Sequence, residues 1–234
     1  MDANTTQRIK DSMAFEAART KPPTGFPRLP DIPAARYVDP QFLELEKQGV
    51  WKRSWLYAGH AIQAAEPGSW FLMRNSGTPI LVVRDLQGEF RAYYNTCRHR
   101  GGPLVTQDAG QGRGFVCSYH GWSYALDGQL KSVRDKRDFV DLDFACRSLL
   151  PVRCETLGSW IFINEAAEAP TLIESLGSVA DELRQFDLDN LMLVHSASYD
   201  VPCNVKVLLD VFLEVYHLKS IHEETADRFL DHGG

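Results

Sequence analysis

The feature that most constrains this chain is a set of two cysteines and two histidines in two short segments. The first segment reads CRHRGGPLV over residues 97–105, and the second reads CSYHGWSYALDG over residues 117–128. Each segment offers one Cys and one His, and seventeen residues separate His99 from Cys117. Thiolates and imidazoles are the ligands that soft metals select. The glycines in both segments suit tight loops, so we expect two loops that present four metal ligands.

Two kinds of metal site fit these ligands. Two Cys and two His can hold a tetrahedral zinc ion, but structural zinc sites usually take both Cys from one knuckle and the other two ligands from another. Here each segment gives a mixed pair, Cys97 with His99 and Cys117 with His120. That arrangement favours a dinuclear iron–sulfur cluster in which both Cys bind one iron and both His bind the other. Histidine ligation raises the reduction potential of such a cluster above that of an all-Cys cluster.

The residues around these segments predict an antiparallel β domain. Between residues 69 and 165, short β-branched and aromatic runs alternate with turn signals at Asn75–Gly77, Gln87–Gly88 and Asp127–Gly128. Elsewhere the pattern predicts an irregular proline-rich arm over 20–40, helices over 40–57, 170–186 and 204–222, and a strand over 191–201.

Composition excludes several classes of protein. The net charge of −6 is spread without long runs of one sign, which argues against a nucleic-acid surface. No stretch of about 18 apolar residues occurs, so we expect no membrane span. The N-terminus lacks the apolar stretch of a secretory signal, and the five cysteines are an odd number. Together these features predict reduced thiols and a cytoplasmic location.

A second group of chemically active side chains lies in NVKVLLDVFLEVYHLKSIH, residues 204–222. On a straight helix Asp210, Glu214 and His217 share one face, whereas His222 lies about 140° away from His217. Two histidine ligands to one metal would need the helix to end or bulge near Lys219–Ser220. The alternative is an amphipathic helix with a few polar residues on its exposed face.

Both groups resemble motifs of one family. The first matches the Rieske motif, C-x-H-x(15–17)-C-x-x-H, with Ser118 where the family commonly has proline. The second is similar to the mononuclear iron motif of Rieske non-heme iron oxygenases, but Val205 replaces the usual Trp and Val211 the usual Asn. The matching positions of the second motif are Asn204, Lys206, Asp210, Glu214, Tyr216, His217 and His222.

The resemblance implies roles for three of these residues. In the family, two histidines and a carboxylate form a facial triad on Fe(II), so His217 and His222 would be two of the three iron ligands. Glu214 occupies the place of the acid that links a neighbouring subunit's cluster histidine to the iron's histidine. Glutamate at this place occurs in branches that act on quaternary amines, whereas many ring-hydroxylating members have aspartate.

The resemblance also implies an α+β fold in three parts. We expect an N-terminal arm and helix over 1–45, a Rieske 2Fe-2S domain over 46–165, and the start of a helix-grip catalytic domain over 166–234. Family chains are much longer and take the third iron ligand from far downstream. We therefore expect a fragment, a truncated product or a subunit completed by another polypeptide, with Asp227, Asp231 and His232 as exposed tail residues.

The function implied is that of an oxygenase alpha subunit. It would relay electrons from the cluster to the mononuclear iron, which activates O₂ to hydroxylate an aromatic or quaternary-amine substrate. NAD(P)H electrons would come through a separate reductase, with or without a ferredoxin, because no GxGxxG signal occurs in this chain. Relatives assemble as homotrimers or α3β3 complexes. The rival interpretations are an electron-transfer protein or a fragment without oxygenase activity.

Overall fold

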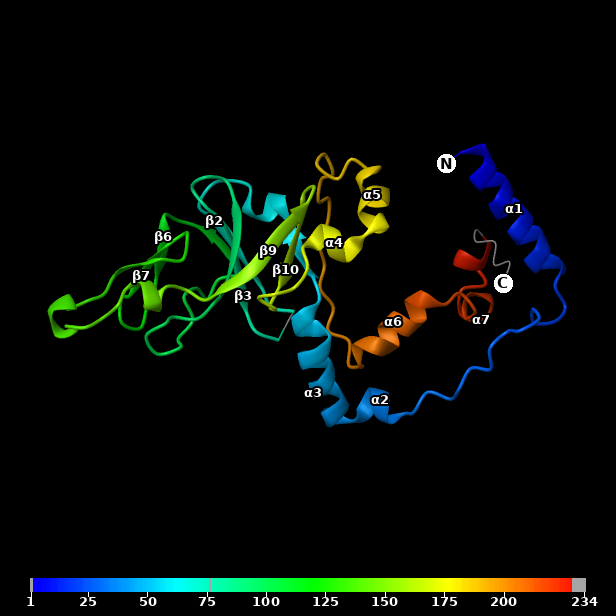
Figure 1. Cartoon of the computed structure of the whole chain (residues 1–234), viewed down its shortest axis with the longest axis horizontal. Coiled ribbons are helices and arrows are strands. Elements are labelled where there is room, and N and C mark those ends of the chain that lie inside the picture. The colour runs from blue at the N-terminus through cyan, green and yellow to red at the C-terminus, as the bar shows by residue number, and fades with distance from the viewer. Residues whose placement is uncertain (1, 76, 229–234) are drawn as a thin grey trace. The chain divides into compact units, whose positions relative to one another are not determined.

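The computed structural model describes residues 2–75 and 77–228 and divides into two compact units (Figure 1). One unit is Glu44–Ser198, and the other combines Met1–Leu43 with Tyr199–Gly234. Helix α3 (Pro40–Gly49) contains the boundary between Leu43 and Glu44.

The unit Glu44–Ser198 is built on two antiparallel sheets. The larger has the order β1-β10-β9-β4-β3-β2-β5 and the smaller the order β6-β7-β8, so the predicted antiparallel β domain is confirmed. The strands are β1 (Leu56–His60), β2 (Ser69–Met73), β3 (Ile80–Arg84), β4 (Phe90–Tyr94), β5 (Ala109–Gln111), β6 (Gly114–Val116), β7 (Ser123–Ala125), β8 (Leu130–Ser132), β9 (Pro151–Leu157) and β10 (Trp160–Asn164).

The turns of these sheets follow the turn signals in the sequence. Asp127–Gly128 connects β7 to β8, and Gly128 has a φ of 85°, a value that favours glycine. Asp85 closes the β3–β4 turn, because its Oδ1 accepts from the backbone N–H groups of Gln87 and Glu89 at 2.9 and 3.0 Å. Its Oδ2 accepts from Arg91 Nε at 2.6 Å.

Alternate residues of β2 and β3 contribute to two hydrophobic cores. Phe71 and Val82 belong to one core, whereas Leu72 and Leu81 belong to the other. The second core also receives Tyr124 and Leu130 from the smaller sheet, and it includes Cys97 and Cys117. The predicted cluster cysteines therefore lie in the core that the two sheets share.

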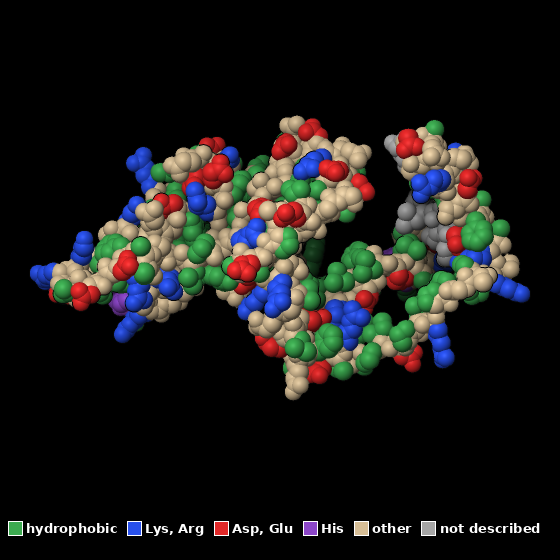
Figure 2. Space-filling model, viewed as in Figure 1, with side chains coloured by type: hydrophobic (Ala, Val, Ile, Leu, Met, Phe, Trp, Pro, Cys, Tyr) green, Lys and Arg blue, Asp and Glu red, His purple; other side chains and the backbone are tan. Residues whose placement is uncertain are grey.

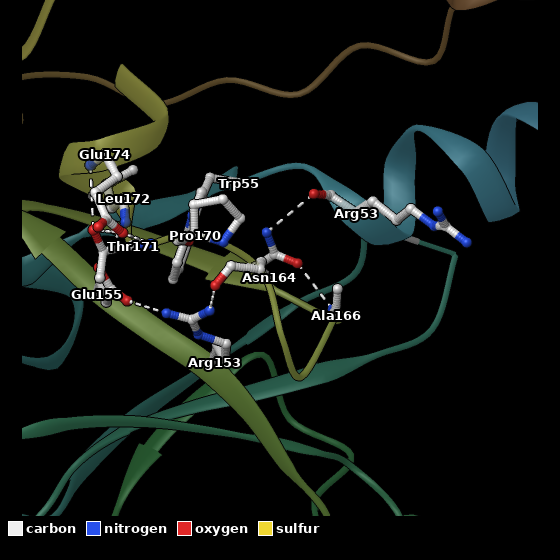
Figure 3. A network of polar contacts seen from close by, with 11 residues as sticks. Arg53, Trp55, Arg153, Glu155, Asn164, Ala166, Pro170, Thr171, Leu172 and Glu174 are labelled. Carbon is white, nitrogen blue, oxygen red and sulfur yellow. Dashed lines mark hydrogen bonds and ion pairs between the residues drawn. The ribbon is translucent and has the colours of Figure 1, made fainter. Parts of the chain in front are cut away.

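A polar network attaches the chain after β10 to β9 (Figure 3). Helix α4 (Leu172–Leu176) begins with a capping box between Thr171 and Glu174. Glu155 of β9 accepts from the Leu172 backbone N–H at 2.8 Å and from Arg153 Nη2 at 2.8 Å. Trp55 Nε1 donates to the Pro170 carbonyl at 3.0 Å. Helix α5 (Ser178–Arg184) follows α4 after Gly177, whose φ is 54°.

The second unit is helical. It contains α1 (Ala3–Ala18), α2 (Ala35–Val38), α6 (Val205–Leu213) and α7 (Leu218–Ile221). The proline-rich arm predicted over 20–40 is irregular up to residue 34, but α2 lies within its predicted range. Helix α1 was not among the predicted elements, although Asp2 caps it by accepting from the Thr5 backbone N–H at 2.8 Å.

Several sequence predictions are wrong in extent or type, and the single helix predicted over 170–186 is divided at Gly177 into α4 and α5. The helix predicted over 40–57 ends at Gly49, and residues 56–60 form β1 instead. Residues 191–200 form no strand, because an alternating segment becomes a strand only where a partner strand supplies hydrogen bonds. The helix predicted over 204–222 ends at Leu213. In the part of the chain that the structure describes, no helix combines the length and apolar character needed to cross a bilayer.

Candidate metal centres

The two predicted cluster loops share one backbone hydrogen-bond pattern. In the β4–β5 loop, Gly101 N donates to the Cys97 carbonyl at 2.9 Å and Cys97 N donates to the Gly102 carbonyl at 2.8 Å. In the β6–β7 loop, Cys117 makes the equivalent bonds with Gly121 and Trp122, both at 2.9 Å. Each loop thus closes from the cysteine to the fourth and fifth residues after it.

Glycine is required at the same position in both loops. Gly101 and Gly121 have φ values of 75° and 70°, which residues with a Cβ rarely adopt. Each is the residue whose N–H donates to the cysteine carbonyl. The glycines after each Cys–His pair are therefore fixed by the shape of the loop.

Asn95 fixes the first loop at its base. Its Oδ1 accepts from the backbone N–H groups of Leu104 and Val105 at 3.0 and 3.1 Å, and its Nδ2 donates to the Val105 carbonyl at 2.8 Å. A single buried amide thus joins the two ends of the loop that carries Cys97 and His99.

The four predicted ligands come together in two pairs. His99 Nδ1 and His120 Nδ1 lie 3.1 Å apart, close to the ~3.4 Å expected for two nitrogens bound tetrahedrally at about 2.1 Å from one metal. Cys97 and Cys117 are each 2% exposed. Among the described residues, no three His, Cys, Asp or Glu side chains are grouped as a single ion would require. The mixed Cys–His pair from each loop and the paired histidine nitrogens fit a dinuclear cluster with both histidines on one iron.

Aromatic rings hold the histidines in place. The His99 ring stacks on Trp122 with centroids 4.7 Å apart and an interplanar angle of 9°, and Phe139 meets both rings edge-on. The His120 ring lies 3.9 Å from that of Tyr119, which is exposed. Burial and the nearby His120, Arg100 and Arg147 lower the pKa of His99. The neutral imidazole that a metal needs is thereby favoured.

Tyr124 contacts one cysteine directly and was not among the predicted site residues. Its hydroxyl lies 3.3 Å from Cys97 Sγ and accepts from the Arg98 backbone N–H at 3.0 Å. Burial raises the pKa of Tyr124, so the hydroxyl stays protonated and can donate to a thiolate. Its only signal in the sequence was a place in the alternating WSYAL segment.

The second group of predicted residues lies where α6 ends. Glu214 is extended, with φ −128° and ψ 157°, and its carboxylate accepts from the His217 backbone N–H at 3.1 Å. The other carboxylate oxygen contacts His217 Nδ1. Because of this contact with His217, the pKa of Glu214 is lowered. His217 and His222 flank α7, and their ring centroids are 5.5 Å apart.

The helix is interrupted earlier than the sequence predicted, between Leu213 and Leu218. The short α7 then ends at Ile221, next to the predicted Lys219–Ser220. As a result Asp210 does not share a helical face with Glu214 and His217, and its carboxylate instead accepts from the Tyr37 hydroxyl at 2.6 Å. No described residue joins His217 and His222 as a third ligand. Asp231 and His232 lie outside the described residues.

Two family models match the chain. The Rieske [2Fe-2S] domain matches residues 54–148, and the ring hydroxylating alpha subunit (catalytic domain) matches residues 188–232. The first range contains all four predicted cluster ligands, and the second contains Glu214, His217 and His222. The domain boundaries at residues 45 and 165 stay predictions.

Curated relatives are oxygenase subunits. The chain is 30% identical over 201 residues to the glycine betaine monooxygenase oxygenase subunit of Chromohalobacter salexigens, covering 86% of this chain and 45% of that protein. It is 30% identical over 217 residues to the carnitine monooxygenase oxygenase subunit of Acinetobacter pittii, covering 90% and 58%. The chain thus spans about half the length of the curated relatives it matches.

Solved structures agree with these relatives. The quaternary ammonium Rieske monooxygenase CntA in complex with L-carnitine superposes with a TM-score of 0.80 at 27% identity, over 88% of this chain and 62% of that one. Naphthalene 1,2-dioxygenase with indole bound gives a TM-score of 0.60 at 35% identity, over 63% and 34%.

Proposed function

Because this chain belongs to the Rieske oxygenase alpha subunits, we propose that it passes electrons from a 2Fe-2S cluster towards a mononuclear iron. The enzyme would hydroxylate a quaternary ammonium compound. The observation that carries the proposal is the pair of histidine nitrogens 3.1 Å apart beside two buried cysteines. When bound, the cluster supplies one-electron transfer, and the mononuclear iron supplies O₂ activation.

Four side chains would hold the cluster. Cys97 and Cys117 would bind one iron, and His99 and His120 the other. The loop hydrogen bonds orient the cysteines, and Trp122 and Phe139 fix the ring of His99. His99 and His120 are both partly buried, and the exposed Tyr119 lies against His120. Electrons would leave or arrive through these two histidines.

Glu214 would orient an iron ligand. Its carboxylate lies against His217 Nδ1, so this nitrogen carries the proton and Nε2 is left for the metal. His217 and His222 would hold the mononuclear iron together with a ligand from outside the described residues. A related quaternary ammonium Rieske monooxygenase is described by its inter-subunit electron transfer. By analogy, Glu214 would link the iron's histidine to the cluster of another subunit in a homotrimer or α3β3 complex.

The substrate class and the partners follow from the relatives. The curated relatives named above act on glycine betaine and carnitine, and the solved relative binds L-carnitine. Glutamate at position 214 also favours a quaternary ammonium substrate over an aromatic hydrocarbon. Electrons would come from NAD(P)H through a separate reductase, with or without a ferredoxin.

Electron paramagnetic resonance of the reduced, iron-replete chain tests the cluster. We expect a Rieske-type signal, because two neutral histidine ligands on one iron set its electronic character. Cys97→Ser should abolish the signal, whereas Cys146→Ser at an exposed cysteine outside the loops should leave it unchanged. A wild-type protein that holds iron but gives no such signal would overturn the proposed function.

A second candidate function is electron transfer alone. Iron analysis of the complete oxygenase separates the two functions, because an oxygenase holds three irons per chain and an electron-transfer protein two.

Glu214→Gln in the complete oxygenase tests the linking role. We expect slower electron transfer from the reduced cluster to the iron in a single turnover, with an unchanged cluster spectrum. Glu223→Gln, at an exposed position beyond His222, is the matched control. Equal rates in the wild type and the Glu214 variant would show that this carboxylate does not link the two metals.

A further inference from the structure

The helix that precedes the iron ligands is held by the segment 35–42, which we name the N-terminal strap. The Tyr37 hydroxyl donates to Asp210 Oδ2 at 2.6 Å. Asn204 Nδ2 donates to the Tyr37 carbonyl at 3.0 Å. The two contacts lie at opposite ends of nearly two helical turns, so one residue of the strap is bonded to α6 at two separate points.

Two aromatic rings of the strap also cover a lysine of α6. Lys206 is 6% exposed, and its Nζ lies 5.8 Å from the ring centroid of Tyr37 and 5.3 Å from that of Phe42. An ammonium over aromatic faces at these distances is attracted by their quadrupoles. Tyr37 therefore contacts α6 through its hydroxyl, its carbonyl and its ring.

The described residues of α6 contribute few buried side chains. Lys206 is the only buried residue of the helix, whereas Phe212 and Leu213 are 85% and 82% exposed. Figure 2 shows hydrophobic side chains on the surface in the region of α6. Within its unit, α6 thus meets the strap through polar and cation–π contacts rather than through a buried apolar face.

The same helix directs the iron-binding segment. Asp210 lies one turn before Glu214, which ends α6 and receives the His217 backbone N–H. Asn204 caps the start of α6, because its Oδ1 accepts from the Lys206 backbone N–H at 3.0 Å. Its Nδ2 donates to the Tyr37 carbonyl, so both the oxygen and the nitrogen of the side-chain amide are hydrogen-bonded. A rotation of α6 would carry Glu214 and His217 with it.

We propose that Tyr37 is a positioning residue for the mononuclear iron site, which fixes α6 through Asp210 and Asn204 and so sets the direction in which Glu214 and His217 leave the helix. The proposal deepens the proposed function, on which the role of the positioned site depends. The hydrogen bond to Asp210, with a contribution from burial, raises the pKa of Tyr37. The hydroxyl therefore remains a donor throughout the neutral range.

Amide hydrogen exchange on the 234-residue chain tests the proposal. Tyr37→Phe removes only the hydroxyl, and we expect roughly 3- to 10-fold faster exchange across residues 207–217, as for the loss of one hydrogen bond. The strands of Glu44–Ser198 should exchange at unchanged rates. Tyr199→Phe is the matched control, because Tyr199 belongs to the same unit and is 84% exposed.

A second readout separates positioning from general stability. Long-range proton–nitrogen correlation spectra of the His217 ring report which nitrogen carries the proton, and we expect Tyr37→Phe to reduce the population with the proton on Nδ1. Asp210→Asn keeps an acceptor oxygen and should stay close to wild type, whereas Asp210→Ala should match Tyr37→Phe. The double variant Tyr37→Phe/Asp210→Ala should show the same exchange rates and His217 spectrum as either single variant, because both substitutions remove the same hydrogen bond.

The proposal would be overturned if Tyr37→Phe had the same amide exchange and the same His217 spectrum as the wild type. It would also be overturned if the increases in exchange caused by Tyr37→Phe and Asp210→Ala were additive. Both readouts are independent of the Rieske signal. Loss of that signal in the wild type would therefore count against the proposed function, whereas an unchanged α6 in Tyr37→Phe would count against the role of Tyr37 alone.

Discussion

Single buried side chains control the properties of the cluster site, and Tyr124 is the clearest case. Its hydroxyl is 3.3 Å from Cys97 Sγ, and a hydrogen bond to a ligand sulfur stabilises the more negative, reduced cluster. Tyr124→Phe should therefore lower the reduction potential by roughly 40 mV, the one-electron equivalent of a hydrogen bond worth about 1 kcal/mol.

Redox titration followed by circular dichroism would measure this change. Tyr119→Phe serves as control, because that ring lies beside the other pair of ligands at His120 and is exposed. A potential in Tyr124→Phe equal to that of the wild type would mean that the hydroxyl does not donate to the sulfur.

Asp85 makes the stability of the sheet unit depend on pH. Burial opposes its ionisation, but the hydrogen bond from Arg91 and those from the Glu89 and Gln87 backbone N–H groups outweigh burial and hold its pKa below the ordinary 3.8. A depressed pKa contributes stability above the unfolded value, and this contribution is lost as pH falls through the folded pKa.

Asp85→Asn should therefore lower the free energy of unfolding at pH 7 by about 1–3 kcal/mol. The loss relative to wild type should begin to shrink as pH falls below 3.8, where the unfolded carboxylate becomes protonated, and should disappear below the lower folded pKa. Urea unfolding at pH 7 and pH 3 measures both effects, with the exposed Asp141→Asn as control. A pH-independent difference would show that ionisation of Asp85 plays no part.

At the scale of elements, the β7–β8 turn combines a backbone and a packing requirement. Gly128 has a φ of 85°, and a Cβ there would lie 2.6 Å from the Tyr93 ring. Gly128→Ala should cost about 2–4 kcal/mol, the sum of left-handed strain and overpacking. Gly77→Ala separates these terms, because Gly77 has a φ of 86° but no atom within 4 Å of its Cβ position. Similar losses at both sites, measured by thermal unfolding, would contradict a packing role for Tyr93.

Elements whose signals are local could be predicted from the sequence, and elements that depend on partners could not. The turn at Asp127–Gly128 follows from glycine chemistry alone, and β7 and β8 follow from the turn. Segment 191–201 alternates as a strand does, but Met192 and Val194 are exposed and residues 191–200 pair with no strand. Alternation reports a possible strand, whereas pairing is decided elsewhere in the chain.

The site shows the same division. Cys97, His99, Cys117 and His120 could be found because their spacing is part of the loop. Tyr124 could not, because its contact with Cys97 joins residues 27 apart in sequence. The break after Leu213 was placed too late because helical periodicity continues through Glu214, while the extended conformation of Glu214 follows from its contacts with His217.

At the scale of the whole molecule, the cluster should stabilise one unit selectively. Its four ligands lie in Glu44–Ser198, and metal binding to a folded site is folding free energy. All five tryptophans also lie in this unit, so their fluorescence reports its unfolding alone. Removal of the cluster with acid and chelator should lower the unfolding temperature seen by tryptophan fluorescence by several degrees or more.

Hydrogen exchange in α1 provides the control for cluster removal, because this helix belongs to the other unit. We expect no change there. An unfolding temperature of Glu44–Ser198 that is insensitive to cluster loss would show that the loops close fully without metal.

The common hydrogen-bond pattern of the two cluster loops has a consequence for how such a site can be altered. The loops place their cysteines identically, yet one offers histidine two residues later and the other three residues later. Backbone shape and ligand identity are thus set by different residues. Point substitutions at the ligand positions can then change the electrochemistry while the scaffold is retained, so evolution or design can explore a wide span of potentials without rebuilding the domain.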